Sequence, residues 1–547
     1  MHRWTWLAGT RRRHAHRWKW PAGTRRRHAH RRMWPAGTGP RQAHRWTWPA
    51  GTGPRQAHRR TWLAGTVTGA AAVLCVTSVI ACAAPPPRLL LGGITAQRSA
   101  PDGIRALPPG PESRASSAAR AGSASPRGFS SQDGSASQDR SASPGGSASP
   151  AGFALPSLAG APHSAAQRWL AAGSVPGRTP AQRQLAEGAL IDLRLLTRPD
   201  GAVAAAWFGP WKFAWPRDSS WIAAAFAATG HSGDALRVLR FLARVQGPAG
   251  TWAAKYTLAG GPAPAGPGVE LDANGWFPWA VWIWYSEQGG RAGTRRELPA
   301  LWPAVRRAAD ATAASLSAGG LPPPSPDYWE QPVSQPTIGT AGPLLAGLRA
   351  AARLAASLGD VSDERRWASS AARLDRGIQA AFGPEFNRFP NSAGGTSTWL
   401  ALFGTGPGPA HDGLSADSVL TGPDAAVTFL GPPFGPASAA VSAAVARAAR
   451  VLTLPDGGIL PGTTWRGDRT VAWTPATGFF ALYDAATGQR AAAAGWLDWL
   501  AAHRTADGAL PEQVNASGQP VSVAPLGWTC AIVLLAITAM RHPLPVP

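Results

Sequence analysis

The connections between the predicted helices of this chain alternate between long and short, and this alternation constrains the fold more than any other feature of the sequence. In the second part of the chain, apolar residues recur every three or four positions, as from Trp367 through Leu374 to Phe382, which is the spacing of an amphipathic helix. Hardly a strand is predicted. The predicted helices cover residues 180–197, 218–229, 231–245, 271–288, 295–317, 337–358, 361–383, 435–453, 474–485, 488–503 and 525–540, and a twelfth falls between 395 and 431.

Counted in chain order, with the helix between 395 and 431 as the eighth, connections of about 18 to 26 residues follow the first, third, fifth, ninth and eleventh helices. A handful of residues or fewer follow the second, fourth, sixth and tenth. Long loops inside a compact domain are usually functional. If successive helices run up and down, all the long loops lie at the same end of the domain. We therefore predict that residues 164–547 form an all-α domain, an (α/α)6 barrel, with a site assembled from these loops.

The first 66 residues consist of repeats and have a different character. Five copies of a 14-residue unit open at His2, His16, His30, His44 and His58. Residues 1–66 hold 16 Lys and Arg and no acid, while the rest of the chain holds 37 basic against 30 acidic residues. The repeats have no apolar face, so we predict that they are disordered. Such an arm could contact anionic lipid or nucleic acid, but the body carries little net charge, and we predict no nucleic-acid partner.

An apolar run over residues 67–84 follows Arg59 and Arg60, as in a signal peptide. It includes the sequence Val-Ile-Ala-Cys ending at Cys82, which resembles a bacterial lipobox with Cys82 as the acylated residue. An uncleaved peptide anchor is the alternative. In both cases we expect the body outside the cytoplasm, attached to the cell membrane. Residues 85–163 are rich in Ser, Pro, Gly and Ala, and we predict that they form a flexible linker.

The loop before the predicted helix 218–229 carries side chains suited to a sugar. Arg217 and Asp218 offer paired donors and acceptors for vicinal hydroxyl groups, and Trp215 offers a stacking face. The alternative is that Asp218 only caps the helix. A second pair, Arg466 and Asp468, lies in the loop before helix 474–485.

Two further long loops each hold a glutamate. Glu330 follows Tyr328 and Trp329, and a carboxyl wedged beside these rings would stay protonated near neutral pH, as a general acid requires. Glu512 lies in the loop before the last predicted helix and therefore at the same end of the barrel. Two carboxyls on opposite sides of one pocket are the groups that glycoside hydrolysis needs. We predict no metal site in the body, since it has no metal-spaced His/Cys cluster.

An ordered set of motifs over residues 164–547 resembles glycoside hydrolase family 15, which includes glucoamylases, glucodextranases and some bacterial trehalases. The motifs are Phe-Ala-Trp-Pro-Arg-Asp to Asp218, Glu270 to Gly275, Asp-Tyr-Trp-Glu to Glu330, Asp424 to Gly435, Leu-Pro-Glu-Gln-Val around Glu512, and Pro525 to Trp528. The resemblance implies that Glu330 is the general acid and Glu512 the general base of an inverting hydrolysis. The substrate-binding residues would be Trp215, Arg217, Asp218, Trp329, Arg466 and Asp468.

The sequence thus predicts an exported, lipid-anchored, exo-acting α-glucoside hydrolase that releases β-glucose from the non-reducing end of α-glucan oligosaccharides. A trehalase of the same family needs the same acid and base and remains an alternative, and so does a glycan-binding surface lipoprotein without turnover. The linkage could be α-1,4 or α-1,6. The expected mechanism needs no metal or organic cofactor.

Overall fold

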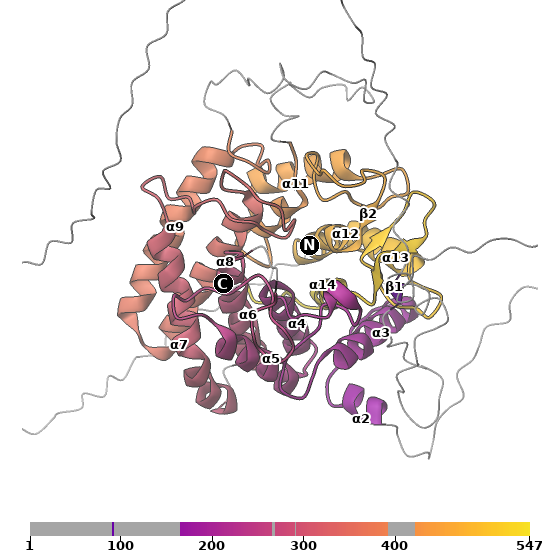
Figure 1. Ribbon diagram of the computed structural model, residues 1–547, viewed down its shortest axis with the longest axis horizontal. Helices are drawn as coiled ribbons and strands as arrows, with labels where there is room; N and C mark the ends of the chain where they lie inside the picture. The colour runs from indigo at the N-terminus through magenta and orange to yellow at the C-terminus, as the bar shows by residue number, and fades with distance from the viewer. Residues whose placement is uncertain (1–89, 92–164, 265–267, 290–291, 392–421) are drawn as a thin grey trace, which may run out of the picture. The chain divides into compact units, whose positions relative to one another are not determined.

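The computed structural model describes residues 90–91, 165–264, 268–289, 292–391 and 422–547 (Figure 1). The predicted repeats, the apolar run with Cys82 and all of the predicted linker except residues 90–91 lie outside the described residues. Those two linker residues form a short strand, β1 (Leu90–Leu91), which pairs in parallel with β5 (Val523–Ala524) of the body.

The centre of the described body is a closed ring of six inner members. Its members are α4 (Pro216–Ala228), α6 (Ala273–Glu287), α8 (Ile338–Leu358), the 3-10 helix η2 (Ala425–Leu430), α12 (Thr474–Ala486) and α14 (Gly527–Ala539). Each packs against the next in this order, and α14 packs against α4, so that the ring is closed (Figure 1).

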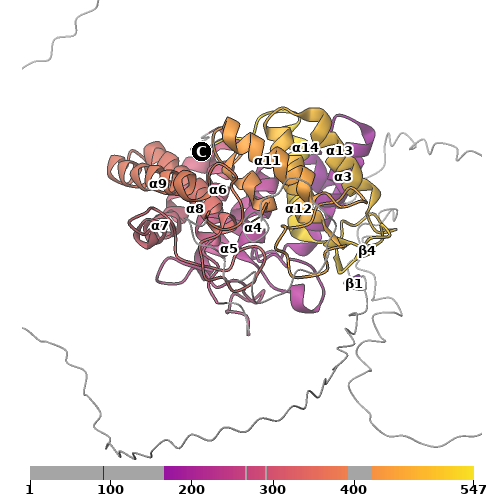
Figure 2. The same ribbon diagram turned by 90° about the horizontal axis from the view of Figure 1, so that it is seen from above.

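A second set of helices surrounds the ring, as the views in Figures 1 and 2 show. Its members are α3 (Pro180–Leu196), α5 (Ser232–Val245), α7 (Ala292–Ser315), α9 (Val361–Phe382), α11 (Ala439–Leu452) and α13 (Arg490–Ala502). Each of α5, α7, α9, α11 and α13 packs against an inner member next to it in the sequence, whereas α3 packs against α14 from the other end of the chain. A short helix, α2 (Ala165–Ala171), precedes α3. This arrangement is the predicted (α/α)6 barrel.

Hydrophobicity decides which helices are inner and which are outer. Every residue of α14 is buried, as expected of a helix that is apolar on all sides. The outer helix α9 buries only one stripe, which includes Trp367, Leu374 and Phe382 as predicted. None of the described helices is both long and apolar enough to cross a membrane.

The fourth member of the inner ring, η2, differs from the prediction. We predicted a helix between residues 395 and 431, and residues 392–421 lie outside the described part of the chain. What the structure describes there is the short 3-10 helix η2, which ends at Leu430. Gly431, Pro432 and Pro433 follow, and proline lacks the N–H that a continuing helix needs.

A small antiparallel sheet connects two of the long loops. Its strands are β2 (Ala472–Trp473), β3 (Gln513–Val514) and β4 (Pro520–Val521). Trp473 pairs with Gln513, which brings the start of α12 beside the loop that carries Glu512.

Candidate active site

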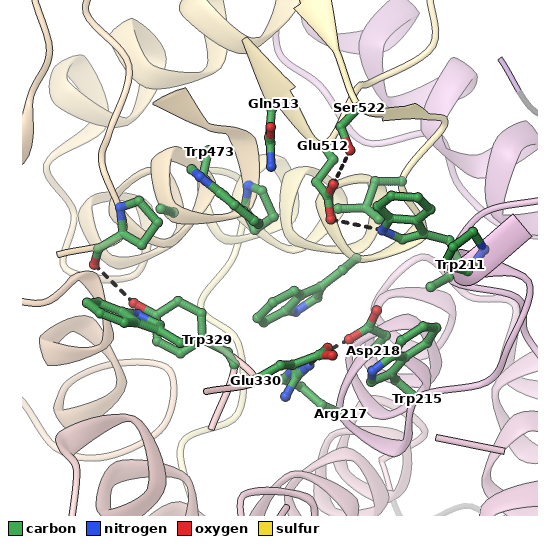
Figure 3. A pocket seen from close by; sticks show the side chains of 18 of the residues that line it. Trp211, Trp215, Arg217, Asp218, Trp329, Glu330, Trp473, Glu512, Gln513 and Ser522 are labelled. Carbon is green, nitrogen blue, oxygen red and sulfur yellow. Dashed lines mark hydrogen bonds and ion pairs between the residues drawn. The ribbon is translucent and has the colours of Figure 1, made fainter. Parts of the chain in front are cut away.

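A cavity of about 490 Å³ opens among the long loops (Figure 3). Its lining includes Trp211, Trp215, Arg217, Asp218, Lys255, Tyr328, Trp329, Glu330, Trp473, Glu512, Gln513, Ser522 and Trp528. These residues come from the loops that lead into α4, α6, α8, α12 and α14, and from the first turns of some of these helices. The structure therefore has a cavity at the end of the barrel where the alternation of loop lengths predicts the site.

Glu512 lies on one side of this cavity and is held by two hydrogen-bond donors (Figure 3). The indole nitrogen of Trp211, at the end of the 3-10 helix η1 (Gly209–Trp211), lies 3.1 Å from Oε1. The hydroxyl of Ser522 donates to Oε2. Burial raises the pKa of Glu512, while the hydrogen bonds from Ser522 and Trp211 lower it. A carboxylate fixed at both oxygens keeps one orientation toward the cavity.

Arg217 and Glu330 lie across the cavity from Glu512 (Figure 3). Arg217 is buried and is the shared partner of four carboxyls. Its Nη1 lies 2.8 Å from Glu270 and 3.3 Å from Asp272, and its Nη2 lies 3.1 Å from Glu330. Its Nε lies 3.4 Å from Asp218, and the guanidinium also stacks over the ring of Trp528. One positive charge therefore faces four acidic groups in a buried environment.

This imbalance of charge affects the acids that line and underlie the cavity. Burial raises the pKa of Asp218 to about 7, with Arg217 opposing the shift and Glu330 adding to it. Burial also raises the pKa of Glu270 and of Asp272, again against the effect of Arg217. Near neutral pH this side of the cavity therefore holds protons that isolated carboxyls would release.

Asp218 does not cap α4. The residue before that helix is Trp215, no side chain caps it, and Asp218 lies within the first turn, facing the cavity. The capping alternative raised by the sequence is thus not realised. Asp218 Oδ1 is buried against Nε of Arg217 at 3.4 Å, a distance and geometry that make an ion pair but no hydrogen bond.

The side chain of Glu330 is more exposed than predicted, because the sequence led us to expect a carboxyl shielded by Tyr328 and Trp329. Its side chain is 35% exposed, and it accepts a hydrogen bond from Arg217. The neighbouring rings do not cover it, because Trp329 turns toward Trp465 and Tyr328 packs into the barrel against Phe429 and Phe479. Glu330 also has φ of 54°, in the left-handed region.

Aromatic rings make up much of the remaining wall. The buried indole nitrogens of Trp215, Trp329 and Trp528 have no hydrogen-bond partner among the described residues. Lys255 Nζ lies 4.8 Å from the ring centroid of Trp215. Flat apolar faces beside unsatisfied donors fit the two sides of a sugar ring, which offers C–H groups on its faces and hydroxyls on its edge.

The structure does not bring Arg466 and Asp468 to the cavity. Both are exposed, and neither is among the lining residues. Asp468 instead accepts hydrogen bonds from the backbone and hydroxyl of Thr470, which closes a local turn. The sequence showed an Arg and Asp pair in the correct loop but could not show which way the loop turns.

Several residues of the site had no predicted role. Glu270 and Asp272 lie in the motif from Glu270 to Gly275, and nothing in that motif indicates that they contact Arg217. Trp211 and Ser522 hold Glu512, and only their presence in two long loops could have pointed to them. Among the described residues, no group of three or more His, Cys, Asp or Glu could hold a metal ion.

No family model matches the chain, and no curated protein matches it in sequence. Solved structures do resemble it. A glycosidase variant solved in complex with glucose has a TM-score of 0.52 and 20% identity, over 66% of this chain and 98% of its own. A bacterial glucoamylase complexed with acarbose has a TM-score of 0.50 and 17% identity, over 66% of this chain and 56% of its own. A glucoamylase from Saccharomycopsis fibuligera has a TM-score of 0.50 and 13% identity, over 67% of this chain and 97% of its own.

At such low identity these similarities establish the fold and leave the chemistry to be argued from the site. The body of this chain has the (α/α)6 barrel fold of glycosidases and glucoamylases.

Proposed function

We propose that this protein is an inverting, exo-acting α-glucoside hydrolase that releases β-glucose from the non-reducing end of α-glucan oligosaccharides. The observation that carries the proposal is the placement of two carboxyls on opposite sides of one cavity: Glu512, fixed by Trp211 and Ser522, and Glu330, bound to Arg217 (Figure 3). Inverting hydrolysis needs one such group to protonate the leaving oxygen and the other to activate water on the opposite face of the sugar.

In the proposed reaction Glu330 donates its proton to the glycosidic oxygen. Glu512 accepts a proton from the water that attacks the anomeric carbon, so an α-linkage gives a β-product. Its burial raises its pKa and therefore makes the carboxylate a stronger base. The partial exposure of Glu330 fits its role, since the acid must reach a bond whose leaving group points toward the open side of the cavity.

Four of the predicted substrate-binding residues keep this role in the proposal because they line the cavity: Trp215, Arg217, Asp218 and Trp329. Asp218 and Arg217 would bind hydroxyls of the terminal glucose, and the indoles would cover its faces. Arg466 and Asp468 receive no role, because they lie outside the cavity lining. The similar structures support a carbohydrate ligand: one holds glucose and another holds acarbose.

Proton NMR of the anomeric region tests the proposal directly. The full chain is incubated with maltotriose, isomaltotriose and trehalose in parallel, and the first product is recorded before mutarotation. Early β-glucose from one substrate is expected and also identifies its linkage; release from trehalose alone would make the protein a trehalase. Inversion of trehalose releases one β-glucose and one α-glucose, so early α-glucose without β-glucose is the result that would mean retention and contradict the base role of Glu512. Binding without glucose release would favour the glycan-binding alternative.

We also propose that the protein is exported and attached to the cell membrane through a lipid on Cys82. The support is in the sequence: Arg59 and Arg60, the apolar run 67–84 and its lipobox-like sequence. Detergent phase partition of the parent protein and the Cys82→Ser variant, expressed in a bacterium, tests this proposal. The parent should enter the detergent phase and the variant should not. Equal partition of both would leave a peptide anchor as the explanation.

A further inference from the structure

A buried ionic cluster, Asp327, Arg388 and Asp424, lies behind the turn that carries Glu330. The Arg388 side chain is only 2% exposed, and the side chains of both aspartates are fully buried. Arg388 Nη2 lies 3.0 Å from Oδ1 of Asp327, and Nη1 lies 2.8 Å from Oδ2 of Asp424. Removing three charged groups from water costs free energy that apolar side chains would not cost, so the cluster calls for an explanation other than stability.

Asp327 fixes the turn through three separate contacts. Its Oδ1 accepts the backbone N–H of Trp329 at 3.0 Å, and its Oδ2 accepts the hydroxyl of Thr337 at 2.7 Å. Its backbone carbonyl accepts the N–H of Glu330 at 2.7 Å. Asp327 therefore binds the backbone N–H groups of Trp329 and Glu330 and links the turn to Thr337 at the start of α8.

Arg388 holds this arrangement from the other side. Its guanidinium lies 3.6 Å from the ring centroid of Trp329, so the same group that binds Asp327 also stacks on the residue before Glu330. A planar guanidinium can donate to a carboxylate and stack at the same time, whereas an ammonium cannot do both.

Asp424 connects the cluster to a third segment of the chain. Besides Arg388, it accepts the hydroxyl of Tyr328 at 2.6 Å and the N–H of Ala426 at the start of η2. The backbone of Arg388 donates to the carbonyl of Gly422. The cluster thus joins the turn, the segment after α9 and the beginning of η2.

The geometry of Glu330 explains why such a support is needed. A non-glycine residue with φ of 54° is in a sparsely populated region and stays there only when its surroundings impose it. If the turn relaxed, the carboxyl of Glu330 would leave Arg217 and change its direction in the cavity. Half an ångström of misplacement matters for a group that must transfer a proton.

We propose that Arg388 is a positioning residue for the general acid: through Asp327 and Trp329 it holds the turn in the one conformation that points Glu330 at the glycosidic oxygen. This inference rests on the proposed function, because it needs Glu330 to act as an acid. Arg388 does not line the cavity, so its effect on turnover can only pass through the turn.

The dependence of turnover on the leaving group tests the inference. The full-length Arg388→Lys protein is compared with the parent on maltose, whose leaving group needs protonation, and on α-glucosyl fluoride, whose leaving group does not. We expect kcat on maltose to fall by about 100-fold or more and kcat on the fluoride by less than about tenfold. Arg349→Lys is the matched control, since Arg349 of α8 forms an ion pair with Asp375 of α9. This variant should lower kcat on neither substrate.

Equal losses on the two substrates, or no loss on maltose, would overturn the inference. If Arg388→Lys does not fold, as judged by circular dichroism, Asp424→Asn replaces it. That variant keeps the pair between Arg388 and Asp327, so kcat on maltose should again fall more than kcat on the fluoride, but by a smaller factor. An equal loss of kcat on both substrates would contradict the inference.

Parallel measurements on Glu330→Gln separate this inference from the proposed function. If Glu330→Gln lacks the selective loss, or if the parent turns over neither substrate, the acid assignment fails and the positioning role fails with it. If Glu330→Gln shows the selective loss and Arg388→Lys does not, only the positioning role is wrong.

Discussion

The indole nitrogen of Trp211 lies 3.1 Å from Oε1 of Glu512, although the two residues are 301 positions apart in the chain. The contact joins the loop before α4 to the loop before α14, and these are neighbouring inner helices because the ring closes there. A carboxylate that will activate water must keep one orientation, and this hydrogen bond provides half of that constraint. The Ser522 hydroxyl provides the other half.

Loss of the Trp211 donor should change the pH dependence of the reaction. In Trp211→Phe the ionised form of Glu512 loses a hydrogen bond, so its pKa should rise. Because the base must be deprotonated, the acidic limb of kcat/KM should move to higher pH, by about one unit for a bond of about 1.5 kcal/mol. Trp282→Phe, whose indole donates to the carbonyl of Pro545, is the control. An unchanged acidic limb would mean that the pKa seen in kcat/KM belongs to a group other than Glu512.

Replacing the base should remove turnover and retain binding. Glu512→Gln keeps the shape of the side chain and can still accept from Ser522, but it cannot take a proton from water. We expect kcat to fall by at least about 100-fold, with the Kd for maltotriose in calorimetry nearly unchanged. Glu187→Gln, on the exposed side of α3, should behave as the parent protein. Parent-like activity of Glu512→Gln would exclude it as the base.

Asp484 should make the protein less stable as the pH rises. It accepts a hydrogen bond from Trp496, and burial raises its pKa from 3.8 to about 6. Well below pH 3.8 the group is protonated in both states. Above pH 6 the folded protein must hold a buried charge, at a cost of up to about 3 kcal/mol. Asp484→Asn should therefore gain stability relative to the parent between pH 4 and pH 7.

Urea unfolding of Asp484→Asn and the parent at both pH values measures this difference, since the other titrating groups cancel. Asp498→Asn, at an exposed position of α13, should show a smaller change. A stability difference between Asp484→Asn and the parent that is the same at both pH values would mean that Asp484 titrates alike in the folded and unfolded states.

The contact between α6 and α8 depends on glycine. A Cβ at Gly275 would lie 2.0 Å from the carbonyl oxygen of Pro343, and helix backbone cannot move aside as a flexible side chain could. Gly275→Ala should therefore lower the free energy of unfolding by about 3 kcal/mol. Gly495→Ala in α13, where a Cβ meets nothing within 4 Å, should raise it by up to about 1 kcal/mol. Equal effects of the two changes in thermal unfolding would contradict the close packing.

Most of the helices, their order and the end of the barrel at which the cavity forms could be predicted from the sequence; the short 3-10 helix η2 could not. Apolar periodicity predicts which face of a helix such as α9 is buried. The lengths of the connections predict which loops lie at the same end of the barrel. For that reason Trp215, Asp218, Glu330 and Glu512 could be expected to meet in one place although they belong to three different loops.

How these residues meet depends on contacts between loops that no local pattern in the sequence reveals. The sharing of Arg217 among four carboxyls, the exposure of Glu330 and the support of its turn by Arg388 depend on how separate loops pack against one another. The same holds for Arg466 and Asp468, which lie in a suitable loop but outside the cavity. Helix periodicity is a local property of the chain, whereas burial, charge pairing and hydrogen-bond direction are set by atoms that are distant in sequence.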